Sequence, residues 1–131
     1  MKIYNTKIIF ADDQKFVRDT VKDYLCEYNA DFARDGKELV ERVARDLTNY
    51  DVIVSDTNMP ILEGPEACRI LRDLGYNGFI IGSSGIDSDS VRTRWENVAN
   101  IFLPKTELFV KLIRLEDLLK TDGSCFLERS G

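Results

Sequence analysis

The chain has 131 residues, of which 44% are hydrophobic and 31% are charged, and its formal net charge is −5 at pH 7. This length fits one domain with its own core and leaves no room for a second full-sized one. No apolar run is long enough to insert in a membrane, an acidic chain does not suit a nucleic-acid surface, and the absence of histidine excludes histidine triads and histidine zinc sites. The N-terminal residues contain no apolar signal-peptide core, so we expect a cytoplasmic protein.

Short apolar runs, which predict strands, alternate along the chain with apolar residues at helical spacing, which predict helices. The predicted strands are residues 7–11, 30–33, 52–56, 79–81 and 100–103. The apolar stripes of the predicted helices span residues 17–28, 39–47, 67–74, 91–99 and 108–119.

Five alternations of strand and helix predict an α/β fold, in which a parallel sheet is covered by helices on both faces. The fourth helix has only a thin apolar stripe, Val91, Trp95, Val98 and Ala99, so we expect it to be loosely held. Residues 121–131 show no period, and we interpret them as a C-terminal tail that is at best partly ordered, after a domain that spans residues 1–120.

Charged and polar residues follow several of the predicted strands. Asp12 and Asp13 follow the first strand, Asp56 ends the third and Lys105 follows the fifth, while the fourth ends in hydroxyl residues. An isolated Asp at a strand end often only caps a turn or a helix. Because the carboxyl ends of parallel strands meet at one edge, however, we expect these side chains to share a crevice.

Three carboxylates at one sheet edge repel one another unless a hard cation binds there. Mg²⁺ prefers oxygen ligands and commonly bridges carboxylate and phosphate groups. Lysine suits a phosphoryl oxygen and a serine hydroxyl can donate to another. These residues therefore predict a magnesium-dependent phosphoryl site in which a carboxylate is the candidate nucleophile.

The order of these motifs resembles the receiver domain of two-component response regulators, in a single-domain form, over about residues 5–120. The matching residues are Asp12, Asp13, Asp56, Met59, Pro60, Gly64, Ser84, Gly85 and Lys105. The resemblance implies a flavodoxin-like, doubly wound, five-stranded parallel sheet of order 2-1-3-4-5 with five helices. It also implies a site at the switch point between the first and third strands.

The resemblance implies that Asp56 accepts a phosphoryl group from a histidine kinase or a histidine phosphotransfer protein. In that case the chain is not an enzyme in the usual sense, although it catalyses its own phosphorylation and dephosphorylation at Asp56. By the same resemblance, Asp13, Asp56 and the backbone carbonyl of Asn58 bind Mg²⁺ directly, and Asp12 acts mainly through water.

The resemblance also implies how the signal leaves the site. Lys105 pairs with one phosphoryl oxygen and Ser84 donates to another, moving toward the site and opening space for Phe102 to turn inward. Phosphorylation adds charge and acceptor oxygens, which shift a two-state equilibrium. We expect the fifth strand with the fourth and fifth helices to bind a downstream target protein, and the chain to be a monomer.

Two positions depart from the family pattern. Thr106 follows Lys105 where a proline in a cis peptide is usual, and a non-proline cis bond costs about 2.5–4 kcal/mol, so this loop is either trans or strained. Gly82 and Ser83 replace larger apolar residues late in the fourth strand. Spacing to Lys105 and the following glycine favour Ser84 over Ser83 as the site hydroxyl.

Other functions remain open on the sequence alone. The protein could dock on a target or pass its phosphoryl group onward to a histidine phosphotransfer protein. It could also be a degenerate receiver that binds partners without phosphorylation. A phosphatase with an Asp nucleophile would need a second Asp two residues after Asp56 as general acid, and Asn58 stands there.

Overall fold

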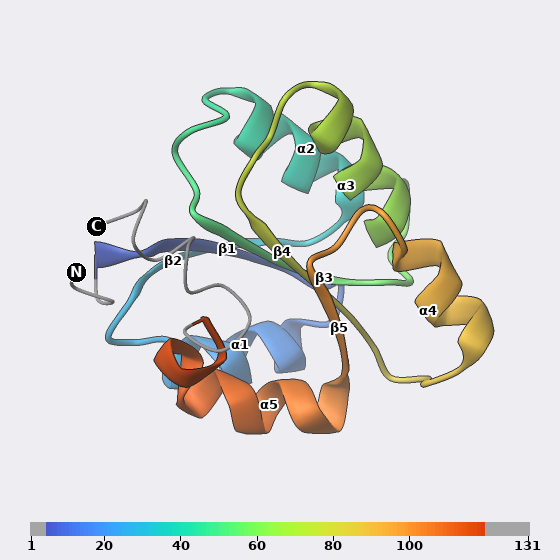
Figure 1. Cartoon of the computed structure of the whole chain (residues 1–131). Coiled ribbons are helices and arrows are strands. Elements are labelled where there is room, and N and C mark those ends of the chain that lie inside the picture. Colours follow the sequence, from blue (N-terminus) through green and yellow to red (C-terminus); the bar gives the residue numbers. More distant parts are fainter. Residues whose placement is uncertain (1–4, 120–131) are drawn as a thin grey trace.

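The computed structural model describes residues 5–119 (Figure 1). Its strands are β1 (Lys7–Ala11), β2 (Asn29–Ala33), β3 (Val52–Asp56), β4 (Phe79–Ser84) and β5 (Ile101–Pro104). Its helices are α1 (Lys15–Tyr24), α2 (Gly36–Ala44), α3 (Gly64–Asp73), α4 (Asp89–Trp95) and α5 (Lys105–Ile113), followed by a short helical segment at 115–119. The predicted tail, residues 121–131, lies outside the described residues.

All five strands are parallel and lie in the order β2-β1-β3-β4-β5, which confirms the predicted topology. Helices α1 and α5 cover one face of the sheet, and α2 and α3 cover the other, with α4 beside them (Figure 1). The connections reverse direction between β1 and β3. In an open parallel sheet this reversal leaves a crevice at the carboxyl ends of those two strands.

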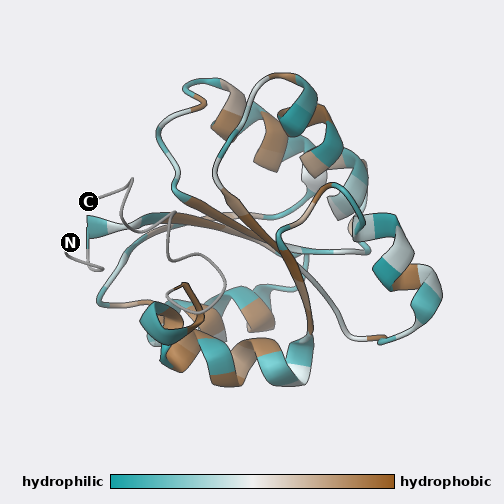
Figure 2. Ribbon diagram, in the orientation of Figure 1, coloured by the Kyte–Doolittle hydropathy of each residue, from teal (hydrophilic) through white to brown (hydrophobic). Residues whose placement is uncertain are grey.

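Alternate side chains of the strands fill two cores. Ile8 and Phe10 of β1 pack in the core beneath α1 and α5, whereas Ile9 and Ala11 pack in the core beneath α2 and α3. Figure 2 shows the result: the strands are hydrophobic in the central part of the sheet and the helices are banded. With both faces covered, the strands hold their carboxyl ends in fixed positions. Within residues 5–119, no helix has the length and apolar character needed to cross a bilayer.

Helix α4 differs from its sequence-based expectation. It begins after Ser88, whose Oγ accepts a hydrogen bond from Val91 N–H at 3.2 Å, and it ends at Trp95 rather than continuing to Ala99. Asn97 has φ 64°, a left-handed conformation that turns the chain toward β5. Trp95 is 2% exposed and Val98 is 4% exposed, and Val91 and Ala99 pack against the same core, so the predicted apolar stripe faces the sheet.

Candidate functional site

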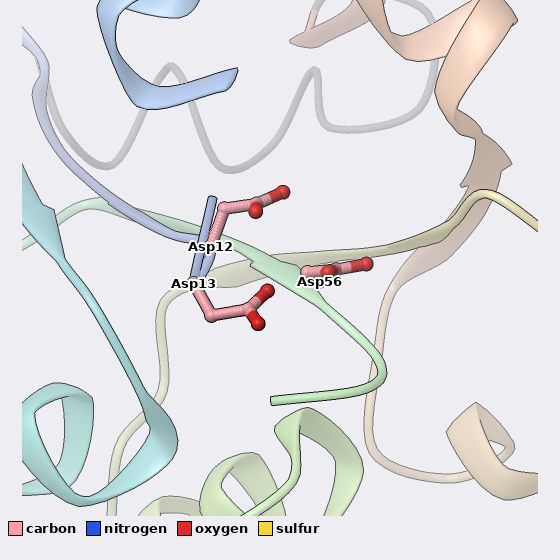
Figure 3. Close-up of side chains that lie close together, drawn as sticks. All are labelled: Asp12, Asp13 and Asp56. Carbon is pink, nitrogen blue, oxygen red and sulfur yellow. The ribbon is translucent and has the colours of Figure 1, made fainter. Parts of the chain in front are cut away.

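Three carboxylates gather at the carboxyl ends of β1 and β3 (Figure 3). Asp12 and Asp13 directly follow β1, and Asp56 is the last residue of β3. One oxygen from each lies within 4.8 Å of the others. The structure therefore brings together the acidic residues that the sequence predicts at this edge.

Burial makes this cluster electrostatically unfavourable. Asp12 is fully buried and Asp56 is 8% exposed, while Asp13 is exposed. Burial, and next the charge of Asp12, raise the pKa of Asp56 to about 6, although Lys105 and the Thr57 N–H oppose this shift. Two buried carboxylates thus share a site in which both cannot ionise without cost.

Lys105, the first residue of α5, supplies the positive charge at the site. Its Nζ lies 3.0 Å from Asp12 Oδ2 and 3.5 Å from Asp56 Oδ2. Burial alone would lower the pKa of Lys105, but the two carboxylates raise it above its usual value. No peptide bond among residues 5–119 is cis, so the Lys105–Thr106 peptide is trans and the ammonium still reaches both acids.

The remaining contacts of Asp12 show whether the carboxylate cluster could hold a cation. Its Oδ1 accepts from Gln14 N–H at 2.9 Å, and Arg18 Nη1 donates to its backbone carbonyl at 2.8 Å. Among the described residues the buried Oδ2 has no hydrogen-bond partner, and its ionic neighbour is the Lys105 ammonium at 3.0 Å. An orphaned buried carboxylate oxygen among three acids is the oxygen-rich environment that Mg²⁺ prefers.

The loop between β3 and α3 is pressed against the site. A Cβ on Gly64 would lie 1.9 Å from the carbonyl oxygen of Asp56, so only glycine fits there. Asn58 lies in this loop and is exposed. Leu62 N–H donates to Pro60 O at 2.8 Å, and the residue between them, Ile61, has φ 72° with a side chain that is 75% exposed.

The two serines at the end of β4 make different contacts. Ser83 Oγ donates to the Leu103 carbonyl of β5 at 2.7 Å, so this hydroxyl is committed within the sheet. Ser84 is 1% exposed, and its Oγ accepts from Ile86 N–H at 3.0 Å in the loop before α4. These contacts favour Ser84 as the site hydroxyl, and its role stays a prediction.

Phe102 lies on β5, two residues before Pro104. Its side chain is half-buried and packs against the core beneath α2 and α3. The guanidinium of Arg92 from α4 lies 4.9 Å from the ring centroid, at cation–π distance. The predicted switch residue therefore contacts α4 through its exposed side.

Thr57 is the residue at this edge that the sequence analysis missed. Its backbone N–H donates to Asp56 Oδ1 at 2.9 Å, its hydroxyl donates to the Ser83 carbonyl at 2.6 Å, and the Trp95 indole N–H donates to that hydroxyl at 2.8 Å. Thr57 is fully buried. The sequence did show Thr57 as a polar residue directly after an apolar strand. Nothing in the sequence, however, indicates that it contacts Trp95.

Comparison with known proteins gives consistent matches. The sequence model of the family described as "Response regulator receiver domain" matches residues 8–115. "Response regulator MprA" of Mycobacterium leprae is 36% identical over 115 residues, which are 86% of this chain and 47% of that protein. The chain thus spans about half the length of the curated relatives it matches.

Solved structures with this fold include the receiver domain of the Francisella response regulator 1452. It has a TM-score of 0.75 and 28% identity, and the match covers 97% of this chain and 100% of that one. The N-terminal domain of an uncharacterized protein from Wolinella succinogenes matches with a TM-score of 0.78 and 23% identity, over 95% and 98% of the two chains, and this likeness concerns the fold alone.

Proposed function

Because the chain belongs to the response regulator receiver family, we propose that Asp56 accepts a phosphoryl group from a phosphohistidine of a partner protein. The partner is a histidine kinase or a histidine phosphotransfer protein. The observation that carries the proposal is the placement of Asp56 within 3.5 Å of Lys105 and beside two further carboxylates, at the switch point of the sheet.

The nucleophile is a carboxylate oxygen of Asp56. A bond forms from this oxygen to phosphorus while the bond from phosphorus to the imidazole nitrogen breaks, and the nitrogen keeps the electron pair. The Thr57 N–H, 2.9 Å from Oδ1, holds the carboxylate in one orientation. Because Lys105 lies 3.5 Å from the other oxygen, its ammonium neutralises charge where the phosphoryl oxygens arrive.

Asp12, Asp13, Asp56 and the carbonyl of Asn58 are the residues that would hold Mg²⁺. When bound, the ion neutralises the carboxylates and the incoming phosphoryl oxygens. Asp13 is the exposed member of the cluster and Asp12 the buried one, which supports direct binding by Asp13 and an outer role for Asp12. Arg18 and Gln14 position Asp12 through its carbonyl and its Oδ1.

Phosphorylation would change the surface formed by α4, β5 and α5, which we assign to a downstream target protein. Ser84 moves toward the phosphoryl group and Phe102 turns inward, away from Arg92. We keep the predictions of a cytoplasmic monomer and of a domain over residues 1–120 as part of this proposal. Sedimentation with and without a phosphodonor would measure the oligomeric state.

Intact-mass analysis after incubation with Mg²⁺ and acetyl phosphate tests the proposal. Wild type should gain one phosphoryl group, and the gain should disappear with chelator or in Asp56→Asn. The matched control is Asp19→Asn, which removes an exposed carboxylate of α1 whose one ion pair within residues 5–119 is with Lys15 at the surface. A wild-type protein that gains no mass would contradict the acceptor role and favour the degenerate receiver, which binds partners without phosphorylation.

A further inference from the structure

Trp95 is the only tryptophan of the chain, and it joins α4 to the phosphoacceptor site. Its ring is 2% exposed and its indole N–H donates to Thr57 Oγ1 at 2.8 Å, although the two residues are 38 apart in sequence. Thr57 directly follows Asp56. The last residue of α4 is therefore hydrogen-bonded to the neighbour of the proposed nucleophile.

Gly82 makes this arrangement sterically feasible. A Cβ at position 82 would lie 2.4 Å from Cδ2 of the Trp95 ring, which is closer than real Cβ contacts come. The indole thus lies directly against the backbone of β4. The small residue late in β4, which departs from the family pattern, is explained by the large ring that occupies its space.

The hydrogen bonds continue from Thr57 across three strand ends. The Thr57 hydroxyl donates to the Ser83 carbonyl at 2.6 Å, and the Ser83 hydroxyl donates to the Leu103 carbonyl at 2.7 Å. All of these side chains are buried, so water does not substitute for a broken bond at low cost. The series runs beside Asp56 and Ser84, and it ends two residues before Lys105.

The C-terminal end of α4 is held more firmly than its N-terminal end. Arg94 Nη2 lies 2.9 Å from Glu63 Oε1 and 2.8 Å from Glu66 Oε1 at the start of α3, while Trp95 holds the neighbouring position to Thr57. At the other end, Arg92 pairs with Asp87 on the exposed surface. A displacement of the loop before α4 would therefore rotate the helix about Trp95.

We propose that the Trp95–Thr57 hydrogen bond couples the phosphorylation state of Asp56 to the position of α4, with Trp95 as a positioning residue. This inference rests on the proposed function. When Ser84 moves toward a phosphoryl group, the adjoining Ser83 carbonyl moves with it, and the Thr57 hydroxyl that donates to this carbonyl must reorient. The bond that this hydroxyl accepts from Trp95 then changes, and α4 shifts.

Trp95 fluorescence provides the first test. Wild type, Thr57→Val and the matched control Thr57→Ser are incubated with Mg²⁺ and acetyl phosphate. The change in emission is then divided by the phosphorylated fraction, which intact-mass analysis measures. Wild type and the Ser variant, which keep the hydroxyl, should show a change, whereas the isosteric Val variant should lose about half of it or more. An equal change per labelled molecule in the Val variant would overturn the coupling.

The wild-type result separates this inference from the proposed function. A phosphoryl adduct without any change in emission overturns the coupling alone. A protein that forms no adduct overturns the acceptor role and the coupling with it.

Hydrogen exchange gives a second test that does not depend on the Thr57 variants. Trp95→Phe keeps an aromatic ring against Gly82 but removes the donor, and Phe102→Leu alters the proposed switch residue, another side chain in contact with α4. Phosphorylation should change the exchange of residues 86–95 in wild type and change it about twofold less in Trp95→Phe. An equal response in Trp95→Phe would overturn the coupling, and loss of the response in Phe102→Leu would then assign it to Phe102.

Discussion

At the carboxyl edge of the sheet, Asp12 and Asp56 are buried side by side and repel each other, whereas at the amino ends of β4 and β5 the side chains of Arg72 and Asn100 are hydrogen-bonded. Arg72 of α3 is the centre of the amino edge. Its guanidinium donates to the carbonyls of Val98, Tyr76 and Gly78 at 3.0, 3.0 and 2.8 Å, and to Asn100 Oδ1 at 2.9 Å.

The difference shows that the amino edge of the sheet contributes to stability and the carboxyl edge to binding and chemistry. The amino edge closes the starts of β4 and β5 with charge-assisted hydrogen bonds, since Asn100 Oδ1 also accepts from Ile80 N–H at 2.8 Å. The carboxyl edge keeps unfavourable charge that Lys105 relieves only in part. Substitutions at the first edge should therefore change folding, and substitutions at the second should change binding and pH dependence.

The largest expected effect is at the amino edge. Arg72→Met keeps the apolar stem but removes four hydrogen bonds, and should lower the free energy of unfolding by about 3 kcal/mol. The control is Arg69→Met on the same helix, whose exposed guanidinium makes a 3.3 Å bond to Arg94 O and should cost about 1 kcal/mol or less. Urea unfolding measures both, and equal costs would contradict the special role of Arg72.

At the carboxyl edge, removing a charge should stabilise the protein. Because the folded-state pKa of Asp56 is raised to about 6, the folded protein binds a proton between about pH 4 and 6 that the unfolded chain has released. Stability therefore falls as pH rises through this window, and the cost persists above it. In metal-free buffer at about pH 8, Asp56→Asn should raise the free energy of unfolding by about 1–2 kcal/mol.

The same comparison at lower pH supplies the control. The gain from Asp56→Asn should be much smaller near pH 4, where the wild-type carboxyl is protonated in the folded state and about half protonated in the unfolded state. Asp19→Asn, at an exposed position, should not produce a gain that depends on pH in this way. A gain that is equal at both pH values would contradict the charge explanation.

A smaller effect is expected from magnesium. Mg²⁺ at about ten times its dissociation constant should raise the free energy of unfolding of wild type by about 1.4 kcal/mol. Asp56→Asn, which lacks one of the three carboxylates, should gain clearly less, and Arg72→Met should gain as much as wild type. Thermal unfolding with and without chelator measures these shifts, and equal gains in wild type and Asp56→Asn would argue against a cation held by this cluster.

The sequence predicted the fold and the acidic edge because both depend on local order. An apolar run followed by an acid places Asp12 and Asp56 at strand ends, and the parallel topology then brings those ends together. The correction at α4 concerns where a helix stops. Helical spacing continues to Ala99, but the backbone leaves the helical conformation at Glu96 and turns at Asn97, which has φ 64°, and this turn cannot be read from periodicity.

The residues that sequence reasoning missed act through contacts between distant segments. Thr57 meets Trp95, and Arg72 meets carbonyls that precede β4 and β5. Threonine and arginine are common surface residues, and their roles here arise only when the fold buries them beside unpaired backbone or indole groups. A departure from the family pattern, at Gly82, was the single sequence clue to this part of the structure.

The turn at Ile61 bears on which substitutions the protein could tolerate in evolution or in protein engineering. A β-branched residue at φ 72° costs about 1–2 kcal/mol, and a side chain that is 75% exposed returns little burial. Asparagine or glycine would relieve that strain without disturbing either core. Substitution at this single position could therefore raise stability, and the gain could offset destabilising substitutions at other positions.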